Sequence, residues 1–282
     1  MVTIQQTFIQ NKNILYLVAT PIGNMSDLSF RALETLKKVD YIFTEDTRMA
    51  LKILHFYNFK NKLISLHKYN EKERLQQILC LLKEGKNLAL ISNAGTPLIS
   101  DPGLFLVQEV KKAGFYVTVI PGPSAFLAGF VLSSFETPFL FLGFLSKKKE
   151  MKKKILLKYR FFEGSLILYE SAQRIKETLL LIHVCYGERN ISLSRELTKK
   201  FETIITGSLE EILQQELSLK GEYVLVIETN KNNDLYQDVS LEEHVIFFLE
   251  QGYTEKEAFI KVARERKISK KILFNKFKIA KN

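Results

Sequence analysis

The hydrophobic pattern of the first half of the chain alternates short apolar runs with amphipathic stretches. Residues Ile14–Ala19 form a continuous apolar run, which is typical of a strand buried on both faces of a parallel sheet. In the stretch Leu28–Lys38 the leucines recur on one stripe of a helix, which Ser26 or Asp27 can cap. This alternation favours an α/β domain with a largely parallel sheet.

The same periodicities predict the other elements of the first half. Strands are expected at Tyr41–Thr44, Leu63–Leu66, Leu88–Ser92, Tyr116–Ile120 and Phe139–Phe144, and helices at Thr47–Phe56, Glu71–Glu84, Leu104–Lys112 and Ser124–Leu132. Apolar periodicity is lost in the lysine-rich window after Leu145. We therefore place the N-terminal domain at residues 1–145.

Fewer helices are predicted in the second half. Strands are expected at Ser165–Tyr169, Ile191–Arg195, Phe201–Thr206 and Glu222–Ile227, and helices at Ala172–His183 and Leu209–Gln215. Because strands follow one another directly, this second α/β domain (146–232) should contain antiparallel pairs.

A small helical appendage is expected at residues 233–282. The polar stretch Asn230–Asp238 precedes a segment whose apolar residues recur at helical spacing. Thr254 and Glu257 form a capping-box pattern, and Ser269 can cap a last helix. Three short helices with basic exposed positions suggest a helix-turn-helix-like tail.

Composition narrows the class of protein. The 282 residues are 46% hydrophobic and 26% charged, as in ordinary globular proteins. We expect a cytoplasmic protein, because a secretion signal is missing and the most apolar stretch, Phe126–Leu145, is interrupted by Glu136 and Pro138. Two distant cysteines and four scattered histidines predict neither a disulfide framework nor a metal site.

The basic charge is concentrated in one window. Between Lys147 and Arg160 there are eight basic residues and one acid, Glu150, which accounts for +7 of the net charge of +10. A solvated basic face is the ordinary explanation for such a run. Beside a cleft, we interpret it as a loop that follows RNA phosphates. The residues are Lys147, Lys148, Lys149, Lys152, Lys153 and Lys154.

Four loops after predicted strands are rich in Gly, Pro and small polar residues. They begin at Thr20, Asn93, Pro121 and Glu170. Single loops of this kind are usually plain turns, but four at the same sheet edge indicate a ligand site. The sequence lacks GxGxxG and GxxxxGK[ST] motifs, so a dinucleotide bound in the usual way is not expected.

Several motifs occur in a characteristic order: EDTR from Glu45, SNAGTPLISDPG from Ser92, PGPSA from Pro121, YES from Tyr169, RELTKKFE from Arg195 and GEYVLVIE from Gly221. In this order they resemble the tetrapyrrole methylase superfamily. Within it, they are most similar to the enzymes that methylate the 2′-hydroxyl of a cytidine in 16S ribosomal RNA. The resemblance runs from about Ile14 to Glu228, and the helical tail fits as well.

The resemblance implies a homodimer of two α/β domains, with S-adenosylmethionine (AdoMet) in the cleft between them and the decoding region of the small ribosomal subunit as substrate. It assigns cofactor contacts to Pro21, Gly23, Ser92, Asn93, Ala94, Gly95, Thr96, Ser124, Ala125, Tyr169, Glu170, Gly221, Glu222, Tyr223 and Val224. Two positions depart from the family. Asn93 stands where Asp is usual, and Ala172-Gln173 replaces Pro-His.

A ribose hydroxyl is a weak nucleophile, so we expect a base or a cation beside it. The candidates are Glu45, Asp46, Asp101, Glu196 and Lys199, with Arg48 and Arg195 as RNA contacts. The alternative for each acid is an ion pair or a helix cap, because EDTR and RELTK contain their own counter-charges.

Three other functions stay open at this level. The first is an enzyme of the same fold that methylates a small tetrapyrrole, against which the basic window speaks. The second is a non-catalytic RNA-binding factor, which the Asn93 departure allows. A DNA regulator built on the tail would leave the four loops unexplained.

Overall fold

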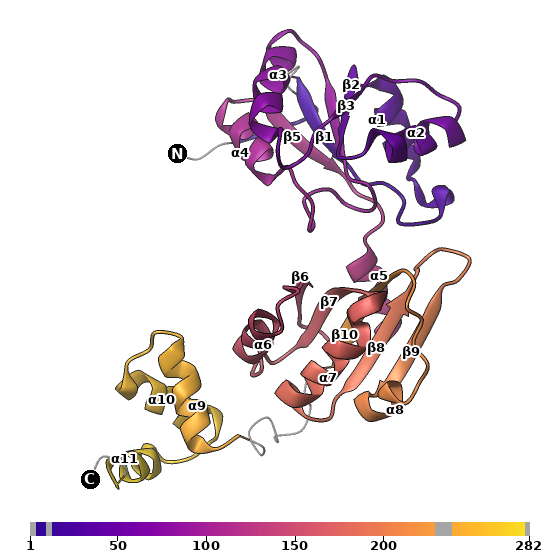
Figure 1. Cartoon of the computed structure of the whole chain (residues 1–282). Helices are drawn as coiled ribbons and strands as arrows, with labels where there is room; N and C mark the ends of the chain where they lie inside the picture. Colours follow the sequence, from indigo (N-terminus) through magenta and orange to yellow (C-terminus); the bar gives the residue numbers. More distant parts are fainter. Residues whose placement is uncertain (1–3, 10–12, 229–238, 280–282) are drawn as a thin grey trace.

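A computed structural model describes residues 4–9, 13–228 and 239–279. Figure 1 shows two α/β units, one beside the other, and a small helical tail next to the second. The predicted α/β fold with C-terminal helices is thus confirmed. The predicted linker Asn230–Asp238 lies outside the described residues, as do the outer ends of the tail assignment 233–282. Within the described ranges, no helix has the length and apolar character that a membrane crossing requires.

The first unit is a parallel five-stranded sheet with strand order β3-β2-β4-β1-β5. The strands are β1 (Ile14–Val18), β2 (Tyr41–Thr44), β3 (Leu63–Ser65), β4 (Leu88–Ile91) and β5 (Tyr116–Ile120). The central strands are almost entirely buried because helices cover both faces. Helices α1 (Phe30–Lys38) and α2 (Thr47–Phe56) pack on one face, and α3 (Glu71–Lys83) and α4 (Leu104–Lys112) on the other.

The second unit is a mixed sheet of order β6-β7-β10-β8-β9, in which only β6 and β7 run parallel. Its strands are β6 (Phe139–Phe144), β7 (Ser165–Ser171), β8 (Asn190–Arg195), β9 (Thr203–Ser208) and β10 (Glu222–Ile227). Helix α5 (Ala125–Ser133) packs on one face, and α6 (Lys149–Lys158), α7 (Ile175–Tyr186) and α8 (Leu209–Leu213) cover the other.

The structure places α5 and β6 on the other side of the boundary expected at Leu145. Strand β6 pairs with β7, and α5 buries Phe130 against Val224 and Val226 of β10. The loss of periodicity after Leu145 therefore marks the start of α6 inside the second unit. The two sheets are separated by the short segment between Ile120 and Ala125.

The lysine-rich window is mostly helix α6, and one of its lysines lies in the protein core. Lys152 is 0% exposed, and its Nζ lies 3.0 Å from Glu170 Oε2 and 2.7 Å from Thr178 Oγ1. Because both partners are buried, Lys152 joins α6 to β7 and α7. The predicted phosphate-tracking loop is therefore mostly a helix, and Lys152 is too deeply buried to contact phosphates.

Several helix and strand ends also differ from the predicted ones. Helix α1 begins at Phe30 with Ser29 as its cap, because a 3-10 turn, Met25–Asp27, occupies the residues expected to cap it. A second 3-10 turn, Ala172–Arg174, precedes α7. Strand β9 begins at Thr203, since the turn before it is closed by the Thr198 N–H, which donates to Glu202 Oε2.

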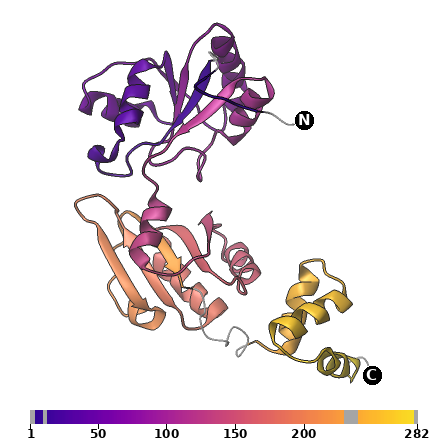
Figure 2. The same ribbon diagram turned by 180° about the vertical axis from the view of Figure 1, so that it is seen from behind.

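The tail consists of α9 (Leu241–Glu250), α10 (Glu255–Glu265) and α11 (Lys270–Ile279) around a small core of its own. Capping boxes start α9 and α10, as predicted for the second of these at Thr254 and Glu257. The tail contacts the second unit through His244, whose ring stacks on Phe161 with centroids 4.4 Å apart. Figure 2 shows the tail from behind, on the side of the second unit away from the first.

Candidate active site

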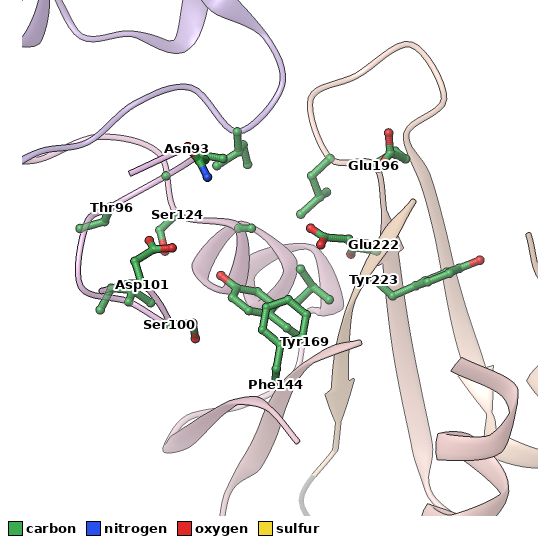
Figure 3. Close-up of a pocket in the computed structure, with 18 of the residues that line it drawn as sticks. Asn93, Thr96, Ser100, Asp101, Ser124, Phe144, Tyr169, Glu196, Glu222 and Tyr223 are labelled. Carbon is green, nitrogen blue, oxygen red and sulfur yellow. The ribbon is translucent and has the colours of Figure 1, made fainter. Parts of the chain in front are cut away.

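A cleft of about 280 Å³ lies between the two sheets (Figure 3). Loops after β1 and β4 and the start of α5 form one wall, and β7, β8 and β10 with the β8–β9 loop form the other. The lining residues are Ile22, Asn93, Ala94, Gly95, Thr96, Ile99, Ser100, Asp101, Ser124, Ala125, Phe144, Tyr169, Ser194, Glu196, Leu197, Lys199, Glu222, Tyr223 and Val224. The four predicted ligand loops are thus not at one sheet edge, because the residues of the fourth, from Glu170, form the end of β7 in the facing sheet.

The first wall is held in shape by hydrogen bonds between its loops. Thr20 and Gly95 form a two-residue bridge, with N–O distances of 2.9 and 3.0 Å. Ser92 Oγ bonds to the carbonyls of Ala94 and Gly95, and Thr96 Oγ1 donates to the Pro123 carbonyl at 3.1 Å. These polar groups satisfy one another, so hydrogen bonds within the wall hold the loop after β4.

The second wall carries a row of side chains across three paired strands. Tyr169, Val224 and Ser194 lie opposite one another on β7, β10 and β8. The Tyr169 hydroxyl accepts a hydrogen bond of 3.0 Å from the Phe126 N–H at the start of α5, and burial raises the pKa of this phenol. Ser194 is 1% exposed, and its Oγ has no hydrogen-bond partner among the described residues.

An orphaned buried hydroxyl costs about 1–3 kcal/mol. Ser194 lines the cleft, so a ligand there can satisfy it. Its neighbour on the same strand face, Ser192, instead bonds to Thr206 Oγ1 at 3.0 Å. This difference makes Ser194 a candidate for contact with a ligand in the cleft.

The β8–β9 loop reaches across to the first unit. Thr198 Oγ1 accepts a 3.0 Å hydrogen bond from the Asn24 N–H, and Lys199 Nζ pairs with Glu196 Oε1 at 3.0 Å. Glu196 and Thr198 have positive φ angles of 50° and 67°, which non-glycine residues seldom adopt. Backbone strain of this kind is commonly kept at functional sites.

Asp101 has the most perturbed carboxyl group in the cleft. Burial, and next the nearby charge of Glu45, raise its pKa to about 6, while a hydrogen bond with Ser92 works in the opposite direction. A carboxylate with this pKa is ionised at neutral pH and is still a better proton acceptor than an ordinary aspartate. Asp101 and Glu222 point into the cleft from opposite walls (Figure 3).

Asn93 connects two of the predicted motifs. Its Oδ1 accepts a hydrogen bond of 3.2 Å from the Asp46 N–H, and its Nδ2 donates to Glu45 Oε2, also at 3.2 Å. The amide therefore orders the EDTR loop against the loop after β4. An aspartate here would put a second carboxylate against Glu45.

Five predicted cofactor residues do not line the cleft: Pro21, Gly23, Ser92, Glu170 and Gly221. Pro21 and Ser92 are buried under the wall they support. A Cβ on Gly23 would meet Lys199 Cγ at 2.4 Å, and one on Gly221 would meet Glu196 Oε1 at 2.6 Å, so both glycines allow close loop packing. Glu170 faces the core, where it pairs with Lys152 and Arg174.

The predicted catalytic and RNA-binding residues also fall into two groups, those that line the cleft and those that do not. Asp101, Glu196 and Lys199 line the cleft, whereas Glu45, Asp46, Arg48 and Arg195 do not. Hydrogen bonds from Arg48 lower the pKa of Asp46 to about 2, which makes it a poor base. The Arg195 guanidinium bonds to Ser218 Oγ at 2.7 Å and to the carbonyls of Lys220 and Phe201. In the structure, Arg195 holds these loops together, and its contact with RNA stays a prediction.

Sequence reasoning missed six lining residues: Ile22, Ile99, Ser100, Phe144, Ser194 and Leu197. Ser194 had a usable signal, because it is a hydroxyl on the buried face of an apolar strand. Ser100 also had one, since it lies within the SDPG motif. The four apolar residues could not be distinguished from core positions.

The charges in the cleft suit a cationic ligand. Three lining carboxylates, Asp101, Glu196 and Glu222, face a single ammonium group, that of Lys199. In the described part of the chain, no cluster of three His, Cys, Asp or Glu side chains could hold a metal ion.

Comparison with known proteins defines the class. The sequence profile of the Tetrapyrrole (Corrin/Porphyrin) Methylases matches residues 14–213, so the chain belongs to this family and is a methyltransferase. Among its relatives are proteins named Ribosomal RNA small subunit methyltransferase I. The one from Bacillus subtilis is 40% identical over 94% of both chains. The one from Mycoplasmopsis pulmonis is 48% identical over 75% of this chain and 96% of its own.

Solved structures agree on the fold. A diphthine synthase superposes with a TM-score of 0.61 at 13% identity, over 77% of this chain and 90% of that one. A uroporphyrin-III-C-methyltransferase from Thermus thermophilus superposes with a TM-score of 0.53 at 17% identity, over 77% and 94%. At these identities the likeness shows the two-sheet architecture alone.

Proposed function

We propose that this chain transfers a methyl group from AdoMet to the 2′-oxygen of a cytidine ribose in 16S ribosomal RNA. The proposal is supported by the named relatives, which match most of the chain and are small-subunit rRNA methyltransferases. The observation that carries it is the cleft between the sheets, with its three carboxylates and its orphaned Ser194 hydroxyl.

The residues of the cleft fit AdoMet. Carboxylates of the second wall, from Glu196 and Glu222, suit its positive groups, and the Ser194 hydroxyl supplies a polar contact beside apolar Val224. When bound, AdoMet supplies an electrophilic methyl group on a sulfonium. Alignment within such a closed site can contribute about 7–11 kcal/mol to a displacement of this kind.

Asp101 is the general base of this proposal. Of the five candidates, it combines a position in the cleft with a raised pKa, and among the described residues no salt bridge engages it. Its carboxylate would accept the proton that the 2′-hydroxyl releases as the new bond forms. Glu196 and Lys199 neutralise each other at 3.0 Å, which suits them to binding.

The N-terminal end of α6 would contact RNA phosphates. Phe144 at the end of β6 lines the cleft, so the chain that follows it enters α6 close to the cleft. Lys147, Lys148, Lys149 and Lys154 are exposed there, and Lys153 is half-buried. We propose these five as the basic contact, with a homodimer acting on the small subunit in the cytoplasm.

The test is methyl transfer from tritiated AdoMet to small ribosomal subunits that lack the modification. We expect label in 16S rRNA, at the 2′-oxygen of one cytidine. Label in a tetrapyrrole and not in RNA would favour a small-molecule enzyme. RNA binding without label in any substrate would favour a non-catalytic factor.

A further inference from the structure

The tail carries four exposed cations at the corner where α10 turns into α11. Arg264, Lys267, Lys270 and Lys271 form this group, which we call the tail basic corner. No salt bridge involves any of the four among the described residues. Lys267 has a positive φ of 53° and forms the turn itself. The proposed methyl-transfer site leaves this surface unexplained.

Four acids of the tail have partners outside the corner. Glu243 and Glu257 close capping boxes, Glu242 pairs with Lys276 at 2.9 Å, and Glu265 bonds to the ring of His244 at 3.0 Å. Among the described residues, none of these four acids forms a salt bridge with a corner residue.

Helix stability does not explain the two lysines of α11. Helices α9 and α10 have glutamates in their first turns, as the helix dipole favours. Helix α11 has no acid there and begins with Lys270 and Lys271 instead. Cations at this end of a helix are unfavourable, because the helix dipole places partial positive charge there. A bound polyanion would make the same charges favourable, because it would pair with them.

The corner is separate from the cleft. No described residue of the tail lines the cleft, and the two views of the molecule place the tail beside the second unit, away from the first (Figures 1 and 2). The family profile ends at residue 213, before the tail begins. A partner bound at the corner would thus add affinity without touching the reacting atoms.

We propose that the tail basic corner binds the phosphate backbone of the RNA substrate, at nucleotides remote from the methylated one. This rests on the proposed function for the identity of the polyanion. The stack of His244 on Phe161 joins the tail to the second unit, so both surfaces can engage one RNA molecule. The two contacts then act as linked binding sites, which raises affinity for long substrates only.

The test compares two full-length variants. In one, Arg264, Lys267, Lys270 and Lys271 are changed to Gln. In the matched control, exposed Lys60, Lys72, Lys83 and Lys111 of the first unit are changed to Gln. Binding to transcribed 16S rRNA and to a short oligoribonucleotide with the target cytidine is measured against salt concentration, with AdoMet affinity alongside.

For the corner variant, we expect the salt slope for long RNA to fall by about 3, at ~0.7–0.9 per lost contact. Affinity for long RNA should fall at least about tenfold at low salt, while the oligonucleotide and AdoMet bind as before. The double variant Lys270→Gln, Lys271→Gln leaves the turn intact and should show about half the slope change.

An unchanged slope, or an equal loss in the control, would overturn the proposal. So would an equal loss on the oligonucleotide. If only binding to vesicles of anionic lipid fell, the corner would be a membrane contact instead. A wild-type protein with a tail-dependent slope but no methyl transfer would refute the proposed function and leave this binding surface standing.

Discussion

Single side chains determine how the cleft is held and charged. Asn93 makes two hydrogen bonds to the EDTR loop, so the amide supports the wall that an aspartate would charge further. The departure from the family at this position is therefore compatible with an intact site. It also leaves Asp101 with one acidic neighbour, Glu45, that raises its pKa.

Asp101→Asn tests the general base. We expect kcat to fall about 10²–10⁴-fold, because no acceptor for the hydroxyl proton replaces it. In the wild type, kcat/KM should rise with pH through about 6, where Asp101 ionises. Glu45→Gln removes a charge that raises this pKa, so its profile should shift to lower pH. A wild-type profile that is flat through this range would contradict the assignment.

The free energy of unfolding of the Asp101→Asn variant provides a second, independent test. A carboxyl whose pKa is raised on folding contributes stability while it is protonated, and loses that contribution as the pH rises through the folded value of about 6. The neutral amide should therefore raise the free energy of unfolding at pH 8 by about 1 kcal/mol, a value reduced for partial solvent screening. An inactive but stabilised variant excludes unfolding as the cause.

The sequence predicted cleft residues best in the loop after β4, where one motif supplies both the loop backbone and the polar side chains. Asn93, Gly95 and Thr96 line the cleft as the motif implied. Glu170 does not, because adjacent residues of a strand face opposite sides and Tyr169 takes the cleft side. Whether a face of β7 lies toward the cleft or toward the core depends on how α5 and α6 pack on the sheet, and a short motif does not encode that packing.

At the scale of elements, helix α6 is attached to its sheet by a buried ion pair. Lys152 lies among Glu170, Thr178 and the apolar core of the second unit. A run of lysines looked uniformly solvated in sequence, because helical periodicity was masked by identical side chains. Only one of them, spaced four residues before Leu156, points inward.

Lys152→Met should remove this anchor. We expect the free energy of unfolding to fall by about 3 kcal/mol, because Glu170 keeps its charge in the core with Arg174 as its remaining cation. Urea denaturation measures the change. Exposed Lys154→Met on the same helix should stay within about 0.5 kcal/mol. Equal losses in the two variants would mean that the pair does not anchor α6.

The domain boundary shows the limit of periodicity at this scale. Strand β6 and helix α5 follow the first sheet in the sequence with the same alternation, so the pattern could not reveal a change of sheet. The prediction of element types was nevertheless largely correct, since buried strands and amphipathic helices have distinct spacings. Pairing across sheets depends on long-range contacts that no local window contains.

On the scale of the whole molecule, the cleft depends on the approach of the two units at Gly23. A side chain there would meet Thr198 Oγ1 at 2.8 Å and the Leu197 carbonyl at 3.0 Å. The Asn24–Thr198 hydrogen bond closes the same contact. Relative placement of the walls is therefore set by backbone contact between two loops.

Gly23→Ala should push these loops apart. We expect the Kd for AdoMet to rise about tenfold, roughly 1.4 kcal/mol, because the ligand would have to bridge a wider cleft. Isothermal titration calorimetry measures it, with Ser26→Ala in the same loop as control, since that side chain is exposed. An unchanged Kd would show that the loops separate without affecting the walls.

The strand order of the second sheet has a consequence for synthesis. The first sheet is complete once residue 120 has emerged, and it can fold while translation continues. Strand β10 is the last strand among the described residues, yet it lies between β7 and β8 at the centre of its sheet. A nascent or truncated chain that ends before Ile227 therefore lacks the strand that carries Glu222 and Val224. Under the proposed function, a chain that has not yet reached Ile227 would therefore be unable to form the AdoMet site.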